Sequence, residues 1–432
     1  MPASAKQVRA VMNGQATGPG TGRRAIVIGA GIIGVTAALS LQRQGFQTTV
    51  VDANEPGRGC SYGNGGAISP DFCVPIALPG MLRRVPKWLL DPQGPLVVRW
   101  ADLPASLPWL LRWIRAGRLD RVERHARALR ALHAPSYERY QRLLGNRGGG
   151  LIEMTGQLYV WQTDAPNATE ALAQRIREGF GVETKALTAN EIRELDANLA
   201  PIFARGLYFP ENGHTLNPLR LVRTLAEMFQ SEGGELIRDK AISFSFKDQA
   251  ACHLQCETRR LEGDIFVVAA GIASASLARS LGDRVPLQAE RGYHAMLPDP
   301  GISPRIKVSN RDYMFGMTPM EHGVRIAGTV EIARPDAPVD ERRPRAMLAI
   351  AKRMYPGLNT EGAEYWMGCR PSTPDSLPVI DRSAHAGNVL YAFGHGHTGL
   401  TGAPVTAELV SALATGQSPP VDPAPYGLKR FH

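Results

Sequence analysis

The sequence predicts an α/β protein, α+β overall, in which a domain with a parallel sheet is joined to a second domain with a mixed sheet. The chain has 432 residues, and a single hydrophobic core stops growing at roughly 250–300 residues, so we expect at least two domains. An apolar run at 25–30, a helical pattern up to Gly45 and a second strand pattern at 48–52 form one β-α-β unit. Alternation of apolar and polar residues over 286–331 indicates the strands of a different sheet.

The remaining elements follow from local patterns. Asn217 and Pro218 are typical of the cap and the first position of a helix, which we expect to extend to about residue 232. Apolar residues at 264–270, followed by Gly271, indicate another buried parallel strand. The other predicted helices lie within 79–147 and 167–198 and over 341–355 and 403–415. The other predicted strands form a hairpin at 151–163 and lie at 206–209, 235–246, 251–257, 363–370 and 388–393.

Glycines between the first strand and the first helix predict a dinucleotide-binding turn. Gly29 permits a tight turn, Gly31 lets backbone N–H groups approach a pyrophosphate, and Gly34 lets the helix pack close to the sheet. Asp52 ends the next strand, where it can accept hydrogen bonds from both ribose hydroxyls, and its charge would repel the 2′-phosphate of NADP. This arrangement predicts a Rossmann-like domain that binds a dinucleotide.

Two further glycine-containing segments favour FAD over NAD. One is the strand that ends in Ala270 and Gly271, and the other begins at Gly394. Three separate loops that expose their backbone suit a long, buried, extended dinucleotide, whereas NAD enzymes usually bind it on one contiguous Rossmann half or pair. We therefore expect FAD. An NAD-linked dehydrogenase stays open as an alternative, and it would lack the yellow colour of a flavoprotein.

Several motifs together resemble one family. They are IVIGAGIIGVTAALSLQRQGFQTTVVD at 26–52, CSYGNGGAISP at 60–70, GHTLNPLRLVRTLAE at 213–227, VVAAG at 267–271, RGYH at 291–294, WMGCRPSTPDSLPVID at 366–381 and GHGHTGLTGAP at 394–404. With them, residues 24–418 resemble the D-amino-acid oxidase superfamily of FAD-dependent amine oxidoreductases, most closely the bacterial D-amino acid dehydrogenase (small subunit) group. We expect a disordered tail at 1–23, a discontinuous FAD-binding domain of residues 24–72, 205–285 and 367–425, and a substrate domain of residues 73–204 and 286–366.

The resemblance implies non-covalent FAD. The loop at 58–66 would cover the pyrophosphate and the flavin, and the loop at 394–401 would direct a helix N-terminus at the flavin pyrimidine. Some family members attach the flavin through a Cys at the position of Gly368, whereas Cys369 lies one residue later here. The implied cofactor-binding residues are Gly29, Gly31, Ile32, Ile33, Gly34, Asp52, Ala53, Ser61, Asn64, Gly65, Gly66, Ala67, Ala241, Ala270, Gly271, Gly396, His397, Gly399, Leu400 and Thr401.

The resemblance also implies the substrate contacts. Arg370 matches the family arginine that holds the substrate carboxylate bidentately, and its alternative role is a surface salt bridge. Tyr293 matches an aromatic position near the substrate, where its hydroxyl could donate to the same carboxylate, and the alternative is a core tyrosine. Tyr313 and Trp366 are weaker candidates of the same type. No catalytic acid–base residue is implied, because the hydride passes directly from the substrate to the flavin.

The implied reaction is the oxidation of D-amino acids to 2-oxo acids and ammonia by hydride transfer from Cα to flavin N5. The electrons would pass to a quinone or to another acceptor. A secondary amine such as D-hydroxyproline, an N-alkyl glycine or an opine stays open as the substrate. A non-catalytic flavoprotein subunit is a more remote alternative, and it would hold FAD without reacting with any amine.

Basic residues concentrate in the segment 81–147 of the predicted substrate domain. It holds 14 Lys and Arg against 5 Asp and Glu, and this excess equals the net charge of +9 of the whole chain. Its first part, 81–115, contains Trp88, Trp100, Trp109 and Trp113. Tryptophan, apolar and basic residues together suit a membrane-interfacial surface, and the alternative is a helical part of the substrate domain with a solvated Arg face. No motif indicates nucleic-acid binding.

Cysteine usage and hydropathy indicate where the protein works. Five widely spaced cysteines suit a reducing compartment, and the cluster Cys252, His253 and Cys256 lacks a second pair of metal ligands, so no metal is expected. No apolar stretch is long enough for a transmembrane helix, and residues 1–24 lack the apolar core of a secretion signal. We expect a cytoplasmic protein, with peripheral contact to the inner face of the cell membrane through 81–115 left open.

Overall fold

The computed structural model describes residues 20, 22–80, 96–247 and 250–431, so the predictions for residues 1–19 and for 81–95, Trp88 included, lie outside the described residues. The helices are α2 (Ile32–Arg43), α4 (Leu103–Ala116), α5 (Leu119–His133), α6 (Ser136–Leu144), α7 (Ala168–Gly179), α8 (Ala189–Leu195), α9 (Pro218–Ser231), α10 (Ser274–Ser280), α11 (Arg342–Met354) and α12 (Gly399–Thr415). In the part of the chain that is described, no helix is both long and apolar enough to cross a bilayer.

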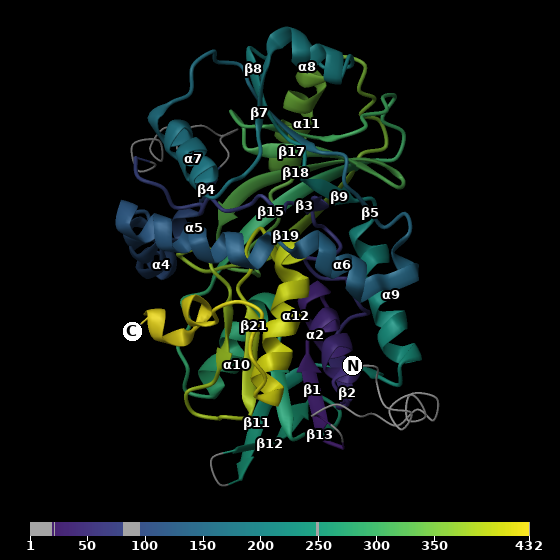
Figure 1. The fold of residues 1–432 in the computed structure, drawn as a ribbon, viewed down its shortest axis with the longest axis vertical. Coiled ribbons are helices and arrows are strands. Elements are labelled where there is room, and N and C mark those ends of the chain that lie inside the picture. Colours follow the sequence, from purple (N-terminus) through teal and green to yellow (C-terminus); the bar gives the residue numbers. More distant parts are fainter. Residues whose placement is uncertain (1–19, 21, 81–95, 248–249, 432) are drawn as a thin grey trace, which may run out of the picture.

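The strands form four sheets, and two of them dominate the molecule. The strands are β1 (Arg24–Ile28), β2 (Gln47–Asp52), β3 (Ala67–Ile68), β4 (Leu96–Val98), β5 (Ile152–Glu153), β6 (Gln157–Trp161), β7 (Lys185–Thr188), β8 (Arg205–Phe209), β9 (Gly213–Thr215), β10 (Glu235–Arg238), β11 (Ala241–Lys247), β12 (Ala250–Cys256), β13 (Arg260–Glu262), β14 (Ile265–Val268), β15 (Gln288–Leu297), β16 (Lys307–Asn310), β17 (Phe315–Met320), β18 (Gly323–Ile332), β19 (Glu364–Ser372), β20 (Val379–Arg382) and β21 (Val389–Phe393). Figure 1 shows the strands around β1 in the lower half of the molecule and the mixed sheet around β18 in the upper half.

The lower sheet has six strands in the order β10-β2-β1-β14-β21-β20, and only β20 is antiparallel to its neighbour. After Arg24, strand β1 is apolar throughout, as expected for a strand of a parallel sheet that is covered on both faces. Ala25 and Val27 share a core with α2 and α12, whereas Ile26 and Ile28 share a core with α10. The predicted β-α-β unit and the predicted strand at 264–270 are confirmed as β1-α2-β2 and β14.

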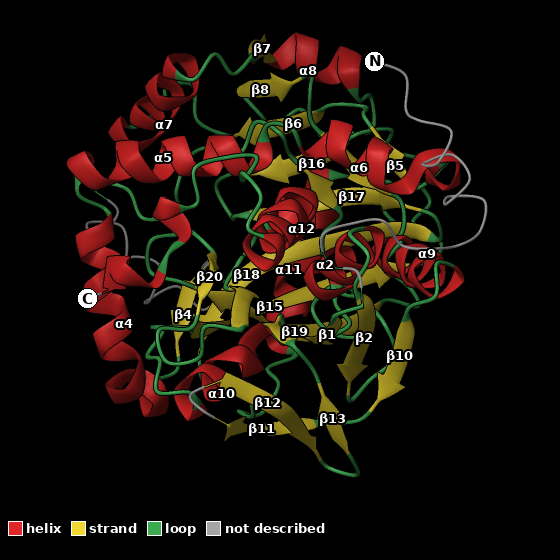
Figure 2. Cartoon of the chain, turned by 60° about the horizontal axis from the view of Figure 1, so that its bottom comes forward, coloured by secondary structure: helices red, strands yellow, loops and turns green. Residues whose placement is uncertain are grey.

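Helix α12 begins at Gly399, earlier than the expected start at about residue 403. Pro404 lies inside the helix and has no N–H group for the Leu400 carbonyl. The Tyr140 hydroxyl of α6 donates to that carbonyl instead, at 2.6 Å. The helix therefore continues through the proline and packs beside α2 (Figure 2). The hydroxyls of Ser40 and Ser411 are 2.7 Å apart at this contact.

The upper sheet has nine strands in the order β19-β15-β18-β17-β16-β6-β8-β7, with β4 added to β18. It is mixed, because β6 is parallel to β16 and β4 is parallel to β18 while the other pairs are antiparallel. The predicted hairpin at 151–163 is wrong. Strand β5 pairs with β9 in a small separate sheet, and β6 pairs with β8 and β16, since the chain turns away at Gly156 with φ +83°.

The described helices of the basic segment are divided between the two large sheets. Leu129 and Leu132 of α5 and Tyr140 of α6 lie in the core that contains α2 and α12. Helix α4 packs against the mixed sheet, where Trp109 contacts Val98 and Ile332. Strand β8 also lies in the mixed sheet, although we expected residues from 205 onward in the FAD-binding domain. The domain division stays a prediction. Helices α5 and α6, from the predicted substrate domain, and strand β8, from the predicted FAD-binding domain, each pack with the other domain.

Candidate active site

The turn between β1 and α2 requires glycines, because a Cβ atom at two of its positions would clash with backbone atoms. Gly29 has φ +112°, and a Cβ there would lie 2.4 Å from the Ala269 carbonyl oxygen. A Cβ on Gly34 would lie 1.8 Å from the Gly29 carbonyl oxygen, so only glycine lets α2 start this close to the strand. A Cβ on Gly31 would meet only the Ser61 hydroxyl, at 3.4 Å. Apart from the Ile32 N–H, which donates to the Ser61 hydroxyl, the first N–H groups of α2 have no partner within the helix, and such groups suit an anion.

Asp52 is held in place at the end of β2 by backbone donors. Its carboxylate accepts hydrogen bonds from the N–H groups of Ala30 and Asn54, each at 2.8 Å. A carboxylate has further lone pairs, so the fixed group can still accept from a ribose hydroxyl. Two alanines were also predicted to bind the cofactor. Ala53 directly follows Asp52, whereas Ala241 is the first residue of β11 and packs against a hydrophobic core.

The loop at 58–66 connects the two large sheets. The Ser61 hydroxyl accepts from the Ile32 N–H at 3.0 Å, which ties the loop to the start of α2. On the other side, Arg325 of β18 donates to the carbonyls of Tyr62 and Asn64, each at 2.8 Å, and Thr318 donates to the Gly65 carbonyl. Arg325 and Thr318, which sequence reasoning did not single out, therefore fix the path of the loop backbone through three of its carbonyl groups.

Glycines of this region either make room for an aromatic ring or border open space. A Cβ on Gly63 would overlap the Trp366 ring, which stacks on His294 at a centroid distance of 5.2 Å. Trp366 therefore supports the loop, and it is not among the residues that line the large cavity described below. Gly65 and Gly271 are open, since a Cβ on Gly65 would meet only Ala327 at 3.4 Å and one on Gly271 would meet nothing within 4 Å.

The loop before α12 brings the third backbone segment to the same region. The Gly396 N–H donates to the Pro371 carbonyl, and the Thr401 hydroxyl accepts from the Ser69 N–H at 3.1 Å. The His395 ring is bonded to the Thr406 hydroxyl, and burial lowers its pKa to about 3, so this imidazole is neutral and structural. The first N–H groups of α12, at Gly399 and Leu400, have no partner within the helix and carry its positive dipole end.

A cavity of about 1130 Å³ lies against the mixed sheet. Its other walls are the segment 72–78, helix α4 and helix α7. Arg370, Glu290 and His397 line one part of this cavity. A space of this size accommodates a small organic molecule, and a few polar groups on a largely apolar wall are typical of a ligand site.

Arg370 of β19 keeps its positive charge available. It donates to the backbone carbonyls of Thr329 and Gly328, at 2.9 and 3.4 Å. A Cβ on Gly292 would lie 2.1 Å from the guanidinium carbon, so this glycine makes room for the side chain. Burial lowers the pKa of Arg370, yet no carboxylate among the described residues forms an ion pair with it. An arginine bound only by neutral carbonyls can bind a carboxylate bidentately.

Glu290 lies directly opposite Arg370 in the pairing of β15 with β19, and it was not predicted. Its carboxylate is 2.6 Å from Nε2 of His397. Burial raises the pKa of Glu290, but the hydrogen bond to His397 and the charge of Arg370 outweigh burial and hold the pKa below its usual value. An acidic residue in a strand pattern, just before Arg291 and Gly292, is the signal that could have revealed it. His397 was expected to contact the cofactor, and the structure pairs it with this carboxylate.

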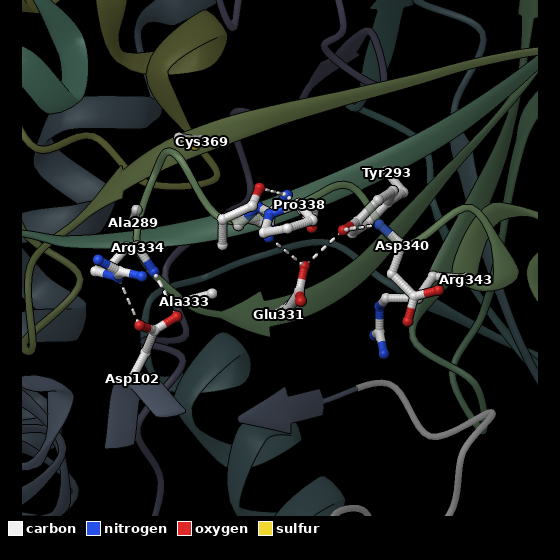
Figure 3. A network of polar contacts seen from close by, with 12 residues as sticks. Asp102, Ala289, Tyr293, Glu331, Ala333, Arg334, Pro338, Asp340, Arg343 and Cys369 are labelled. Atoms are coloured by element: carbon white, nitrogen blue, oxygen red, sulfur yellow. Dashed lines mark hydrogen bonds and ion pairs between the residues drawn. The ribbon is translucent and has the colours of Figure 1, made fainter. Parts of the chain in front are cut away.

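Tyr293 is not brought together with Arg370. Successive residues of a strand point to opposite faces, so Tyr293 shares a face with Arg291 and lies on the other side from Glu290. Its hydroxyl donates to Glu331 at 2.5 Å and accepts weakly from the Asp340 N–H at 3.4 Å (Figure 3). The expected hydrogen bond from Tyr293 to a substrate carboxylate therefore does not fit, and the alternative of a core tyrosine does.

The other predicted contacts are placed as follows. Tyr313 packs against the core beneath the mixed sheet and does not line the cavity, although its neighbour Met314 does. Cys369 is on the Tyr293 side of β19, where its sulfur is 3.9 Å from the Pro335 carbonyl. Among the residues described, no group of three His, Cys, Asp or Glu side chains is placed to hold a metal ion.

Comparison with known proteins agrees with this geometry. Residues 24–413 match the family described as FAD dependent oxidoreductase. The chain is 36% identical over 418 residues to the D-amino-acid oxidase of Bradyrhizobium diazoefficiens, covering 95% of this chain and 99% of the relative. It is 28% identical over 416 residues to the D-amino acid dehydrogenase of Chromohalobacter salexigens, covering 94% and 99%.

The fold is also found in a solved structure. Glycine oxidase from Geobacillus kaustophilus superimposes with a TM-score of 0.71 at 19% identity, over 94% of this chain and 99% of that one. The mixed α/β architecture is thus that of a solved oxidase structure. The chain belongs to the FAD dependent oxidoreductase family and is an FAD-dependent amino acid oxidase or dehydrogenase.

Proposed function

We propose that this protein oxidises D-amino acids to 2-oxo acids and ammonia. The observation that carries the proposal is Arg370, a guanidinium on the wall of the cavity that is bound by backbone carbonyls and has no ion pair among the described residues. An α-amino acid supplies the carboxylate that this group lacks. The names of the two relatives, D-amino-acid oxidase and D-amino acid dehydrogenase, support the D configuration.

The backbone segments described above would hold FAD. The glycine-lined start of α2 suits the pyrophosphate, Asp52 suits a ribose, and the start of α12 suits the flavin ring that gains negative charge on reduction. When bound, FAD supplies the two-electron acceptor for the hydride from the substrate Cα. Cys369 points to the far side of β19, which supports non-covalent binding.

The chain's own contribution to the reaction is orientation and proton transfer. Arg370 would hold the carboxylate and so fix Cα and the amine of the substrate. The substrate ammonium has to lose a proton before its lone pair can assist hydride departure. Because Glu290 accepts from Nε2–H of His397, Nδ1 of that ring carries a lone pair, and no hydrogen bond to Nδ1 occurs among the described residues. We assign His397 as the proton acceptor and Glu290 as the group that sets its tautomer.

Anaerobic bleaching of the flavin tests the proposal. The holoenzyme is mixed with a panel of D-, L- and N-alkyl amino acids, and the loss of the oxidised flavin absorbance is followed. We expect bleaching by D-amino acids, followed by reoxidation with air or with a quinone. Bleaching only by L-amino acids or only by N-alkyl substrates would move the function to another amine, and no bleaching with any amine would refute it.

We further propose that the electrons pass to a membrane quinone through contact of helix α4 with the lipid surface. Leu107, Leu111 and Ile114 of α4 are exposed by 48%, 47% and 37%, with Arg112 and Arg115 beside them. Apolar and basic residues on one amphipathic helix suit an anionic membrane surface. Trp109 does not take part, since it is buried and donates to the Ser372 carbonyl.

Liposome flotation tests this surface. Leu111→Asp should reduce flotation with anionic liposomes and leave dye-coupled activity unchanged, because the side chain is on the outside of the helix. Leu195→Asp on α8, which is 41% exposed, is a matched control that should float like the wild type. Equal flotation of the wild type and the Leu111 variant would refute the proposed membrane contact.

A further inference from the structure

The cavity has a second cationic end, separate from Arg370. Arg311 and Arg177 both line the cavity. The Arg311 guanidinium lies 4.8 Å from the centre of the Tyr159 ring, and that of Arg177 lies 5.4 Å from the centre of the Phe209 ring. The two rings are themselves 4.7 Å apart. Cation–π contact at these distances holds both guanidinium groups in defined places next to each other.

The charges of these two arginines are only partly balanced by the described protein, through the carboxylate of Asp71, which pairs with Arg130 and also attracts Arg177. Neither has an ion pair with a carboxylate among the described residues, and the hydrogen bond of Arg177 is to the neutral Gln174, at 3.4 Å. Arg205, on the same wall, shows the contrast, since it is paired with Glu170 at 2.7 Å. A cation that is partly removed from water and lacks a counter-ion is costly, so an anionic ligand would be bound favourably there.

The neighbouring groups add positive charge. Asp71 lines the same cavity, but its carboxylate is shared with Arg130 at 3.3 Å, and burial raises its pKa to about 6. Lys307 lies behind, and burial together with the charge of Arg311 lowers its pKa to about 8. The carboxylates of Glu178 and Glu183 lie on exposed residues at the rim. The inner end of the cavity is therefore electropositive.

The topology sets the distance between the two cationic ends. The Arg370 guanidinium bonds to carbonyls of β18, and the Arg311 guanidinium lies over Tyr159 of β6. The strand order β18-β17-β16-β6 puts three strand spacings between them, which is about 14 Å. Each bidentate guanidinium–carboxylate pair takes up about 4 Å between carbon atoms. Two carboxylate carbons on the order of 6 Å apart would reach both ends, which is the span of a five- or six-carbon amino dicarboxylic acid.

We propose that Arg311 and Arg177 form a second anion-binding subsite, and that the substrate is a D-amino acid with a carboxylate at the end of its side chain. The inference rests on the proposed function, because it takes Arg370 as the site of the α-carboxylate. Arg370 then selects an amino acid, and the second subsite selects an acidic one. A neutral side chain of the same length would leave both arginines without a counter-ion.

Acid and amide pairs of equal size test the subsite. We would measure kcat/KM of the holoenzyme for D-glutamate against D-glutamine and for D-2-aminoadipate against its side-chain amide, D-homoglutamine. The wild type should favour the acid by about 10- to 100-fold, the range of a charge-assisted hydrogen bond. Arg311→Gln should bring this ratio close to one, mainly through KM of the acid. Arg193→Gln on the exposed surface of α8 is the matched control and should keep the wild-type ratio.

A binding measurement separates this inference from the proposed function. Glutarate has two carboxylates and no amine, and its dissociation constant can be followed by the perturbation of the flavin absorbance. We expect Arg311→Gln and Arg177→Gln to weaken glutarate binding about 10-fold or more, at unchanged flavin content. Dependence of glutarate binding on Arg311 in an enzyme that no D-amino acid bleaches would retain the subsite and refute the function. Equal use of acids and amides by the wild type would overturn the subsite while the function stands.

Discussion

The two faces of strand β15 carry the same kinds of side chain but treat their charges differently. On one face, Glu290 lies opposite Arg370, which has only backbone carbonyls as partners among the described residues. On the other face, Arg291 is fully buried and forms an ion pair with Glu331 at 3.1 Å. Arg291 also donates to the carbonyls of Ala337 and Pro338.

The difference separates a structural arginine from a binding one. Glu331 also accepts from Tyr293, so the network on the Arg291 face joins β15, β18 and the loop that holds Pro338 and Asp340 (Figure 3). On that face, the buried cation already has a counter-ion. The Arg370 face opens into the cavity and leaves a cation without its counter-ion, which is the property that a carboxylate substrate would use.

The largest expected effects come from removing each arginine in turn. Arg370→Met should lower kcat/KM by the equivalent of about 3–5 kcal/mol and lower the free energy of unfolding less than Arg291→Met does, because Arg370 has no ion pair among the described residues and supports the Glu290 carboxylate only through its charge. Arg291→Met should do the reverse and lower the free energy of unfolding by about 3–5 kcal/mol, because Glu331 would stay buried without its cation. Flavin reduction kinetics and thermal unfolding of both variants measure this. If both variants lost activity and stability to the same extent, the distinction between a binding Arg370 and a structural Arg291 would be wrong.

A smaller effect is expected from Glu290→Gln. The rate of flavin reduction at neutral pH should fall about 10- to 100-fold, because the amide no longer fixes the tautomer of His397. The deficit should narrow as the pH rises, since more substrate then arrives as the free amine. Stopped-flow rates over a pH series measure it, and a deficit that is constant with pH would assign Glu290 a purely structural role.

The same carboxyl group predicts how stability depends on pH. The pKa of Glu290 is lower in the folded protein than its usual value. Its contribution to stability is therefore complete above the usual carboxyl pKa of about 4.3 and is lost as the pH falls through the lower folded value. The wild type should lose more stability than Glu290→Gln between neutral pH and acid pH in urea titrations. Parallel acid profiles would show that the pair with His397 does not couple to folding.

The smallest expected effect sharpens the assignment of Tyr293. Tyr293→Phe removes the hydrogen bond to Glu331 and should lower the free energy of unfolding by about 1–3 kcal/mol. KM and kcat should stay within about twofold of the wild type, because the hydroxyl lies on the face opposite Arg370. Urea unfolding and steady-state kinetics measure the two quantities. A tenfold rise in KM would contradict this assignment and indicate that Tyr293 contacts the substrate.

Much of the cofactor-binding side could be predicted because its signals are local. Gly34 is required by a contact within one turn, and Gly29 is required by its φ of +112° together with the Ala269 carbonyl just after β14. Asp52 follows directly from the end of the next strand. The start of α12 was less predictable, since Pro404 is tolerated only through the hydroxyl of Tyr140, which is distant in the sequence. The substrate side depends on which strand faces meet, and a register of β15 against β19 and β18 cannot be read from one strand alone.

Arg370 was predicted only through the resemblance to a known family. By itself, the sequence determined the β-α-β unit and the glycines that leave room for a dinucleotide. These depend on steric rules that operate within a few residues. Only the tertiary structure decided that Glu290 meets His397, that Tyr293 turns away from Arg370, and that Arg311 and Arg177 share a cavity with it. The physical reason is that the side chains of a strand alternate between two faces, and packing of the whole sheet selects which face lines the cavity.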